Sequence, residues 1–382
     1  MFDKNTIEKF REIPTPFYYY DVKLLKETLD NLKEESSRYG FKLHYAVKAN
    51  HNERILRIIS SYGFGADCVS WNEIDAAIKA GFSPSEIVFA GVGKSDQEIK
   101  NAIKAGIFCF NCESIPEMEV INEFAQKENK TVSIALRINP LIDAHTHKYI
   151  TTGIAESKFG INTWDLDTVL NRLNDLNNLK LIGIHFHVGS QITRLSVFKT
   201  LCTHINELQE WFSLKNAELK IINVGGGLGI DYDDPEKSPE FGEYFSLLRE
   251  FIELKQGQEI HAEPGRSIVG QCGSLISKVL YIKKGSNTSF AVIDAGMTDL
   301  IRPALYQAYH LIENLTSNGE PTNYDVVGPV CESSDTFAKY IELPETKRGD
   351  IIAIRSAGAY GQAMASRYNL RNLAPAVFSD EL

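Results

Sequence analysis

Long apolar runs are missing from this chain of 382 residues. None approaches the roughly 20 apolar residues that a membrane-spanning helix needs. The opening segment, MFDKNTIEKFREIPTP, has charges where a secretory signal peptide would have an apolar run. An excess of positive charge is also missing, because the net charge is -10, which disfavours nucleic acids and anionic membranes as partners. These absences predict a soluble, cytoplasmic protein with no nucleic-acid or membrane partner.

Cysteine is scarce, with six in the chain and one C-x-x-C, formed by Cys109 and Cys112. A zinc site of this type would need a second pair of ligands, and no second C-x-x-C exists. A disulfide framework is typical of shorter secreted chains with denser cysteines. We therefore expect Cys109 and Cys112 to be buried thiols.

Short apolar runs alternate with longer amphipathic stretches through most of the chain. There are eight such runs, and each interval between them is long enough for a crossover helix: 42–48, 63–69, 86–92, 106–112, 131–138, 181–188, 219–226 and 259–265. Eight strand-plus-helix units predict an α/β fold, a (β/α)8 barrel over residues 22–262, in preference to an open doubly wound sheet.

The chain changes character after this region. From Gly265 onward it is rich in Val and Ile, is punctuated by turn residues, and has few long helical patterns. This composition predicts an all-β domain over residues 263–382. The segment PTPFYYYD (14–21) is expected to add a first strand to the same sheet, so that residues 1–21 belong to this domain.

Polar side chains recur at the carboxyl ends of the predicted barrel strands, where barrel enzymes place their catalytic groups. They are Lys48, Asp67, Arg137, His187, Ser190 and Glu263, with Arg266 three residues after the last of them. A lysine in such a place is usually solvated, but a desolvated one can form a Schiff base. Glu263 could pair with a protonated ring nitrogen or form a salt bridge with Arg266.

The run INVGGGLGI (222–230) is a strand followed by glycines. Glycine lets backbone N–H groups approach an oxyanion closely, so this run predicts a phosphate cradle, with a tight turn as the alternative. It lacks the G-x-G-x-x-G spacing of a dinucleotide site.

His185 and His187 suggest a different class of function. Two histidines at this spacing on a strand share one face and can bind a metal ion. A metal-dependent barrel hydrolase is therefore an alternative, although it would need further ligands from other strand ends, where only Asp67 is available.

Nine ordered motifs together resemble the diaminopimelate decarboxylases, a family of pyridoxal 5′-phosphate (PLP) enzymes in the alanine-racemase-like fold class. They run nearly from end to end of the chain: TPFYYYD, HYAVKAN, HTHKYITTGIAESKFGI (145–161), HVGSQ, GGGLG, EPGR, RPALY, CESSDTFA and GAYG. Any one of these motifs would be weak evidence, but nine in order are specific. The resemblance implies decarboxylation of meso-2,6-diaminopimelate to L-lysine and CO2.

The resemblance also implies roles for individual residues. Lys48 would bind PLP covalently, His187 would lie against the ring, and Glu263 would keep the ring nitrogen protonated. Alanine racemases place an arginine at that nitrogen, so Glu263 favours decarboxylation over racemisation. The full PLP set would be Lys48, Asp67, Arg137, His187, Ser190, Gly226, Gly227, Glu263, Gly265, Arg266 and Tyr360.

Substrate recognition is implied at the distal end of the amino acid. Its carboxylate would contact Arg266, Arg302 and Tyr306, and its ammonium group would contact Glu332. Tyr360 would also bind the substrate. Cys331 would help to protonate the product, reaching the site from the second subunit of a homodimer. Ornithine has no distal carboxylate to pair with two arginines. A related PLP decarboxylase acting on another basic or D-amino acid stays an alternative.

Overall fold

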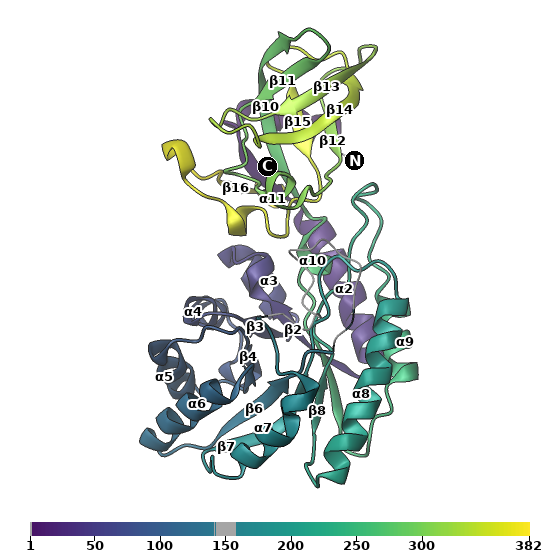
Figure 1. Ribbon diagram of the computed structural model, residues 1–382. Coiled ribbons are helices and arrows are strands. Elements are labelled where there is room, and N and C mark those ends of the chain that lie inside the picture. Colours follow the sequence, from purple (N-terminus) through teal and green to yellow (C-terminus); the bar gives the residue numbers. More distant parts are fainter. Residues whose placement is uncertain (1, 141, 143–157) are drawn as a thin grey trace. The chain divides into compact units, whose positions relative to one another are not determined.

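The computed structural model describes residues 2–140, 142 and 158–382 (Figure 1). Residues 145–157 of the HTHKYITTGIAESKFGI motif lie outside this described part. None of the helices in it is long and apolar enough to cross a membrane. The chain divides into two compact units: one consists of Leu29–Gly229 and Glu240–Gly265, and the other of Met1–Thr28, Ile230–Pro239 and Arg266–Leu382.

Parallel strands close into a barrel in the first unit, where β2 pairs with both β3 and β9 to complete the circle. Each of its eight strands overlaps one of the eight predicted runs, so the predicted barrel is confirmed. The strands are β2 (Phe41–Ala46), β3 (Gly65–Cys68), β4 (Ile87–Phe89), β5 (Cys109–Cys112), β6 (Val132–Arg137), β7 (Leu179–His185), β8 (Ile221–Asn223) and β9 (Glu259–Ala262).

Helices alternate with these strands along the chain, and their ends follow local sequence signals. At the start of α5, the Ser95 N–H donates to the Glu98 carboxylate at 3.0 Å in a capping box. The helix ends at Gly106, whose φ of 70° suits a residue without a side chain. The helices are α2 (Val22–Tyr39), α3 (Glu53–Ser60), α4 (Trp71–Lys79), α5 (Asp96–Ala105), α6 (Ile115–Lys127), α7 (Leu166–Leu173), α8 (Ser196–Leu214) and α9 (Phe241–Phe251).

Burial on both faces explains why the barrel strands read as nearly continuous apolar runs. Every position of β5 is buried, including Cys109 and Cys112, which are free thiols as the sequence predicted. Asn111 in the same strand is buried as well. A buried amide needs hydrogen-bond partners, and those of Asn111 lead directly to the candidate site.

The second unit is built on a mixed sheet, in which most neighbouring strands are antiparallel and the strand order is β12-β15-β10-β11-β13-β14. β1 runs antiparallel to β10, with Phe17 opposite Ile276, which confirms that the segment at 14–21 adds a strand. β16 lies parallel to β1 on its other edge. The strands are β1 (Phe17–Tyr20), β10 (Gly273–Lys284), β11 (Ser289–Ile293), β12 (Ile312–Asn314), β13 (Pro321–Val327), β14 (Thr336–Pro344), β15 (Ile351–Ile354) and β16 (Ala376–Phe378).

An aromatic cluster fills the core beneath β1. Phe10, from helix α1 (Lys4–Glu12), packs its ring against Phe17 and Tyr19 at centroid distances of 5.5 and 5.0 Å. Ile276 and Ile351 complete the cluster from β10 and β15. Phe17 and Tyr19, two residues apart, thus lie in this cluster and fix the register of β1 in the sheet.

Candidate active site

Lys48 lies in a 3₁₀ turn (Val47–Ala49) directly after β2. Its Nζ donates to the Asp67 carboxylate at 3.0 Å, and its side chain is 34% exposed whereas that of Asp67 is fully buried. Burial raises the pKa of Asp67 and the negative charge of Glu263 raises it further, against the opposing charge of Lys48. The site thus contains a partly desolvated amine held by one carboxylate, and both residues are among the polar groups that the sequence places near the strand ends.

Glu263, immediately after β9, is the centre of a buried hydrogen-bond network. One carboxylate oxygen accepts from His185 Nε2 at 2.9 Å, and the other accepts from the side-chain amide of Asn223 at 2.7 Å. The Asn111 amide lies 3.4 Å from the same second oxygen. Burial alone would raise the pKa of Glu263, but His185, followed by Lys48, holds that pKa below its usual range. Glu263 is therefore a buried carboxylate that stays ionised.

The two histidines of the H-x-H pattern have different surroundings. His185 ends β7 and contacts Glu263, while His187 lies two residues beyond the strand, beside Gly226. Burial and then the positive charge of Lys48 hold the pKa of His187 well below its usual range, so its ring is neutral. Within the described residues, no group of three or more His, Cys, Asp or Glu side chains could hold a metal ion. The observed role of His185 is that of a hydrogen-bond partner of Glu263.

The glycines after β8 are required by their contacts. A Cβ on Gly225 would lie 2.0 Å from the Phe186 carbonyl oxygen, and one on Gly226 would lie 2.4 Å from that of Glu263. The Gly227 carbonyl accepts from the Ile192 N–H at 2.9 Å, so the loop that contains Ser190 runs beside the glycines. Glycine therefore lets this turn fit between two strand ends, where its backbone can approach a phosphate.

Two more of the predicted residues have clear structural contacts. Arg137, the last residue of β6, forms an ion pair with Glu113 at 2.7 Å, and both side chains are buried. Its guanidinium also lies 4.7 Å from the centre of the Phe159 ring. A Cβ on Gly265 would lie 3.0 Å from the Cβ of Ala46, so the missing side chain lets the chain pack closely behind the turn that contains Lys48.

Arg266 and Arg302 lie together in the second unit. They begin the short helices α10 (Arg266–Val269) and α11 (Arg302–Tyr306), and both are buried. Arg266 donates to the Tyr232 hydroxyl at 2.6 Å and lies 4.9 Å from the centre of the Tyr360 ring. Arg302 lies 5.1 Å from the centre of the Tyr232 ring. The predicted arginines and Tyr360 are thus brought into one cluster, and Tyr306 ends the helix that Arg302 begins.

Cys331 and Glu332 lie on an exposed loop between β13 and β14. The Cys331 N–H donates to the Asn369 side chain at 3.0 Å, and Glu332 accepts from the Tyr368 hydroxyl at 3.3 Å. These two hydrogen bonds connect Cys331 and Glu332 to the segment around Tyr368.

Sequence reasoning missed several residues of these clusters. The partners of Glu263 on other strands, Asn111 and Asn223, gave one signal, because each is an amide inside an otherwise apolar strand. Tyr232 and His310 were also missed. Both contact Arg302, and His310 follows the RPALY motif by only four residues. The two asparagines could have been predicted from the sequence, because a polar residue within a buried apolar run needs a hydrogen-bond partner.

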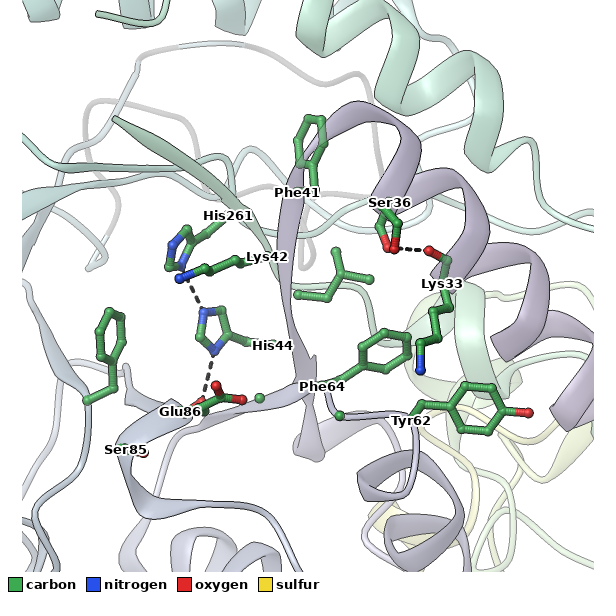
Figure 2. A pocket seen from close by; sticks show the side chains of 15 residues that line it. Lys33, Ser36, Phe41, Lys42, His44, Tyr62, Phe64, Ser85, Glu86 and His261 are labelled. Carbon is green, nitrogen blue, oxygen red and sulfur yellow. Dashed lines mark hydrogen bonds between the residues drawn. The ribbon is translucent and has the colours of Figure 1, made fainter. Parts of the chain in front are cut away.

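A pocket at the opposite, amino-terminal end of the barrel strands includes none of the predicted site residues (Figure 2). His44 Nε2 lies 2.9 Å from His261 Nδ1, and both rings stack with Phe108. Burial and the neighbouring His44 lower the pKa of His261 to about 3. These histidines are neutral parts of the barrel core.

Comparison with known proteins identifies relatives over nearly the whole chain. The family described as "Pyridoxal-dependent decarboxylase, pyridoxal binding domain" matches residues 23–270. A diaminopimelate decarboxylase of Bacteroides thetaiotaomicron is 56% identical over 379 residues, which cover 98% of each chain. A crystal structure of the Helicobacter pylori diaminopimelate decarboxylase complexed with L-lysine is similar, with a TM-score of 0.93, 40% identity, and coverage of 98% of this chain and 94% of that one.

Proposed function

The chain belongs to the diaminopimelate decarboxylase family of PLP-dependent decarboxylases, and from this premise we propose how its residues convert meso-2,6-diaminopimelate to L-lysine and CO2, the last step of lysine biosynthesis. The substrate has one D and one L centre. Because the product is L-lysine, the carboxylate that leaves is the one on the D centre. The L centre, with its carboxylate and ammonium group, is the distal end that the protein must recognise.

The observation that supports this function best is the buried carboxylate of Glu263, which accepts hydrogen bonds from His185 and Asn223. When bound, PLP accepts the electron pair of the breaking C–C bond into its ring, and it does so best when the ring nitrogen is protonated. A carboxylate offers about four lone-pair sites, and the three described donors leave room for a fourth. Glu263 would hold a proton on that nitrogen, and His185 keeps Glu263 charged.

The other groups at the carboxyl end of the barrel fit the same cofactor. Lys48 supplies the amine that binds PLP, and Asp67 orients it. His187, neutral and beside Gly226, would pack on the ring. Backbone N–H groups at the glycines would bind the phosphate, with Ser190 and Tyr360. Arg137 would contact the cofactor, with its guanidinium oriented by the ion pair with Glu113. Residues 22–262 would thus form the PLP-binding domain.

The distal end of the substrate would be recognised by the arginine cluster of the domain formed by 1–21 and 263–382. Arg302 and Arg266 would bind the distal carboxylate, assisted by Tyr306 and Tyr360. Two buried guanidinium groups in contact with one tyrosine favour an anionic ligand. This cluster favours diaminopimelate over a D-amino acid with a simple amine at its far end.

Cys331 and Glu332 would complete the site of a second subunit in a homodimer. Cys331 would donate the proton that replaces the departing CO2, and Glu332 would bind the distal ammonium group. Their exposure supports this assignment, as does an apolar surface next to them: Leu370 is 96% exposed, and Tyr368 and Leu373 are exposed as well. Exposed apolar side chains beside functional groups are typical of an interface. Six free cysteines support a reducing, cytoplasmic location.

The test is to assay the purified protein with PLP for CO2 release from meso-diaminopimelate, L,L-diaminopimelate, D-lysine and D-ornithine. We expect turnover of the meso isomer and formation of L-lysine, with much slower reaction of the other three. Faster turnover of D-lysine or D-ornithine would overturn the substrate assignment while leaving the cofactor assignment in place. Absence of a borohydride-reducible chromophore would overturn the cofactor assignment.

A further inference from the structure

His310 is fixed in one tautomer by its two neighbours. Its Nδ1 lies 2.8 Å from the Arg355 carbonyl oxygen, which can only accept, so Nδ1 bears the hydrogen. Its Nε2 lies 2.7 Å from Arg302 Nη1, a group that can only donate, so Nε2 offers a lone pair. A protonated ring would place two donors face to face. Burial, followed by the charge of Arg302, accordingly lowers the pKa of His310 to about 3.

The contrast with Arg355 shows what is unusual about Arg302. Both guanidinium groups are buried. Arg355 forms ion pairs at 2.8 Å with two carboxylates, Glu236 and Glu313. Arg302 has no carboxylate within ion-pair distance among the residues that the structure describes, and it contacts the His310 ring nitrogen and the Tyr232 ring instead.

A neutral partner leaves the charge of an arginine available. A carboxylate in the place of His310 would orient the guanidinium equally well but would also neutralise it, because burial strengthens ion pairing. An imidazole lone pair orients one N–H and contributes no charge. Tyr232 packs edge-on against the His310 ring at 5.1 Å and 84°, which fixes the plane of that ring.

We propose that His310 is a positioning residue that holds Arg302 with a neutral acceptor, so that the full charge of Arg302 is kept for the distal carboxylate of the substrate. This inference rests on the proposed function, in which Arg302 binds that carboxylate. It makes His310 a determinant of specificity for amino acids with a carboxylate at the far end, acting through Arg302 without touching the substrate.

The test compares two ligands that differ by one carboxylate, L-lysine and 1,5-diaminopentane, in binding to the PLP-loaded enzyme by calorimetry. The variants His310→Gln and His310→Glu form a matched pair, since each places an oxygen near the position of Nε2 and they differ in charge. We expect His310→Gln to keep the wild-type preference for L-lysine. His310→Glu should lose roughly tenfold or more of that preference, the size of one charge-assisted contact, with little change for the diamine. In His310→Glu, the KM for meso-diaminopimelate should rise by a larger factor than kcat falls.

Arg302→Ala separates this inference from the assignment on which it rests. If Arg302→Ala loses the preference for L-lysine but His310→Glu keeps it, His310 has no such role and the proposed function stands. If Arg302→Ala itself keeps the preference, the assignment of Arg302 is wrong. Should His310→Glu fail to fold by circular dichroism, His310→Leu, which removes the acceptor, must lose the preference at least in part. An unchanged preference in His310→Leu would overturn the proposal.

Discussion

Glu263→Gln is the substitution that most directly probes the proposed chemistry. Glutamine has nearly the shape of glutamate, so its carbonyl oxygen can still accept from Asn223, and its amide can donate to His185 once that ring carries its hydrogen on Nδ1, which has no partner among the described residues. The structural cost is one charge-assisted hydrogen bond exchanged for a neutral one, about 1 kcal/mol. PLP should still bind, because Lys48 and the glycine loop are unchanged.

The catalytic cost should be much larger than the structural one. Without a negative charge at residue 263, the ring nitrogen is no longer held protonated, so the cofactor stabilises the electron pair poorly. Preorganised electrostatic contacts of this kind are typically worth about 10²–10³-fold in kcat, and we expect a loss of that size. The assay is single-turnover CO2 release from meso-diaminopimelate, alongside the rate at which the substrate displaces Lys48 from PLP, followed by absorbance.

A matched control is Glu117→Gln, which removes another carboxylate of the barrel from an ion pair with Lys94. That variant should lose stability in urea but keep most of its kcat. If Glu263→Gln released CO2 as fast as the wild type, Glu263 would be a structural residue and the reasoning about the ring nitrogen would be refuted.

Four further outcomes are expected. Lys48→Ala should have no PLP attached after borohydride reduction, by mass spectrometry, and nearly no turnover; covalent PLP in it would contradict the assignment. Arg302→Ala should lower kcat/KM for meso-diaminopimelate roughly ten- to 150-fold without weakening PLP binding, and normal kinetics would remove Arg302 from the substrate site. Inactive Lys48→Ala and Cys331→Ala proteins, mixed and allowed to exchange subunits, should recover roughly a quarter of wild-type activity, whereas inactive hybrids would show that both residues act within one chain. Between pH 7.5 and 5.0 the wild type should lose stability in urea, because the unfolded chain protonates His310 near its ordinary pKa while burial keeps the pKa of His310 in the folded protein at about 3. His310→Gln should lose less stability than the wild type, by up to about 1.4 kcal/mol per pH unit. An equal loss in both proteins would show that His310 is not the cause.

The barrel and the place of Lys48 could be predicted because both depend on local patterns. A strand buried on both faces has an apolar run, and the groups that follow such runs gather at one end of a barrel. Asp67 was found for the same reason, one strand along from Lys48. The glycines after β8 were found because a tight approach leaves no room for a side chain.

The polar partners inside each cluster could not be predicted, because they depend on tertiary contacts. His185 and Glu263 are far apart in sequence, and nothing in the H-x-H pattern distinguishes a metal ligand from a partner of a carboxylate. The contact between His310 and Arg302 depends on a single left-handed residue, Gln307 with a φ of 52°, which ends α11 and turns the chain back. Because position 307 is not a glycine, the sequence gives little indication of this left-handed conformation.

The pairing of β1 with β10 and β16 has a consequence for synthesis of the protein on the ribosome. Phe17 can pair with Ile276, and Tyr20 with Phe378, only after those later residues have been made. At about 5–20 residues per second, the first of these partners is made roughly 10–50 seconds after β1. The barrel unit ends at Gly265, so all of its residues are made before Ile276. β1, which is rich in tyrosine, is therefore made before the barrel strands but can pair only after all of them have been made. Until then it is a segment that chaperones would protect.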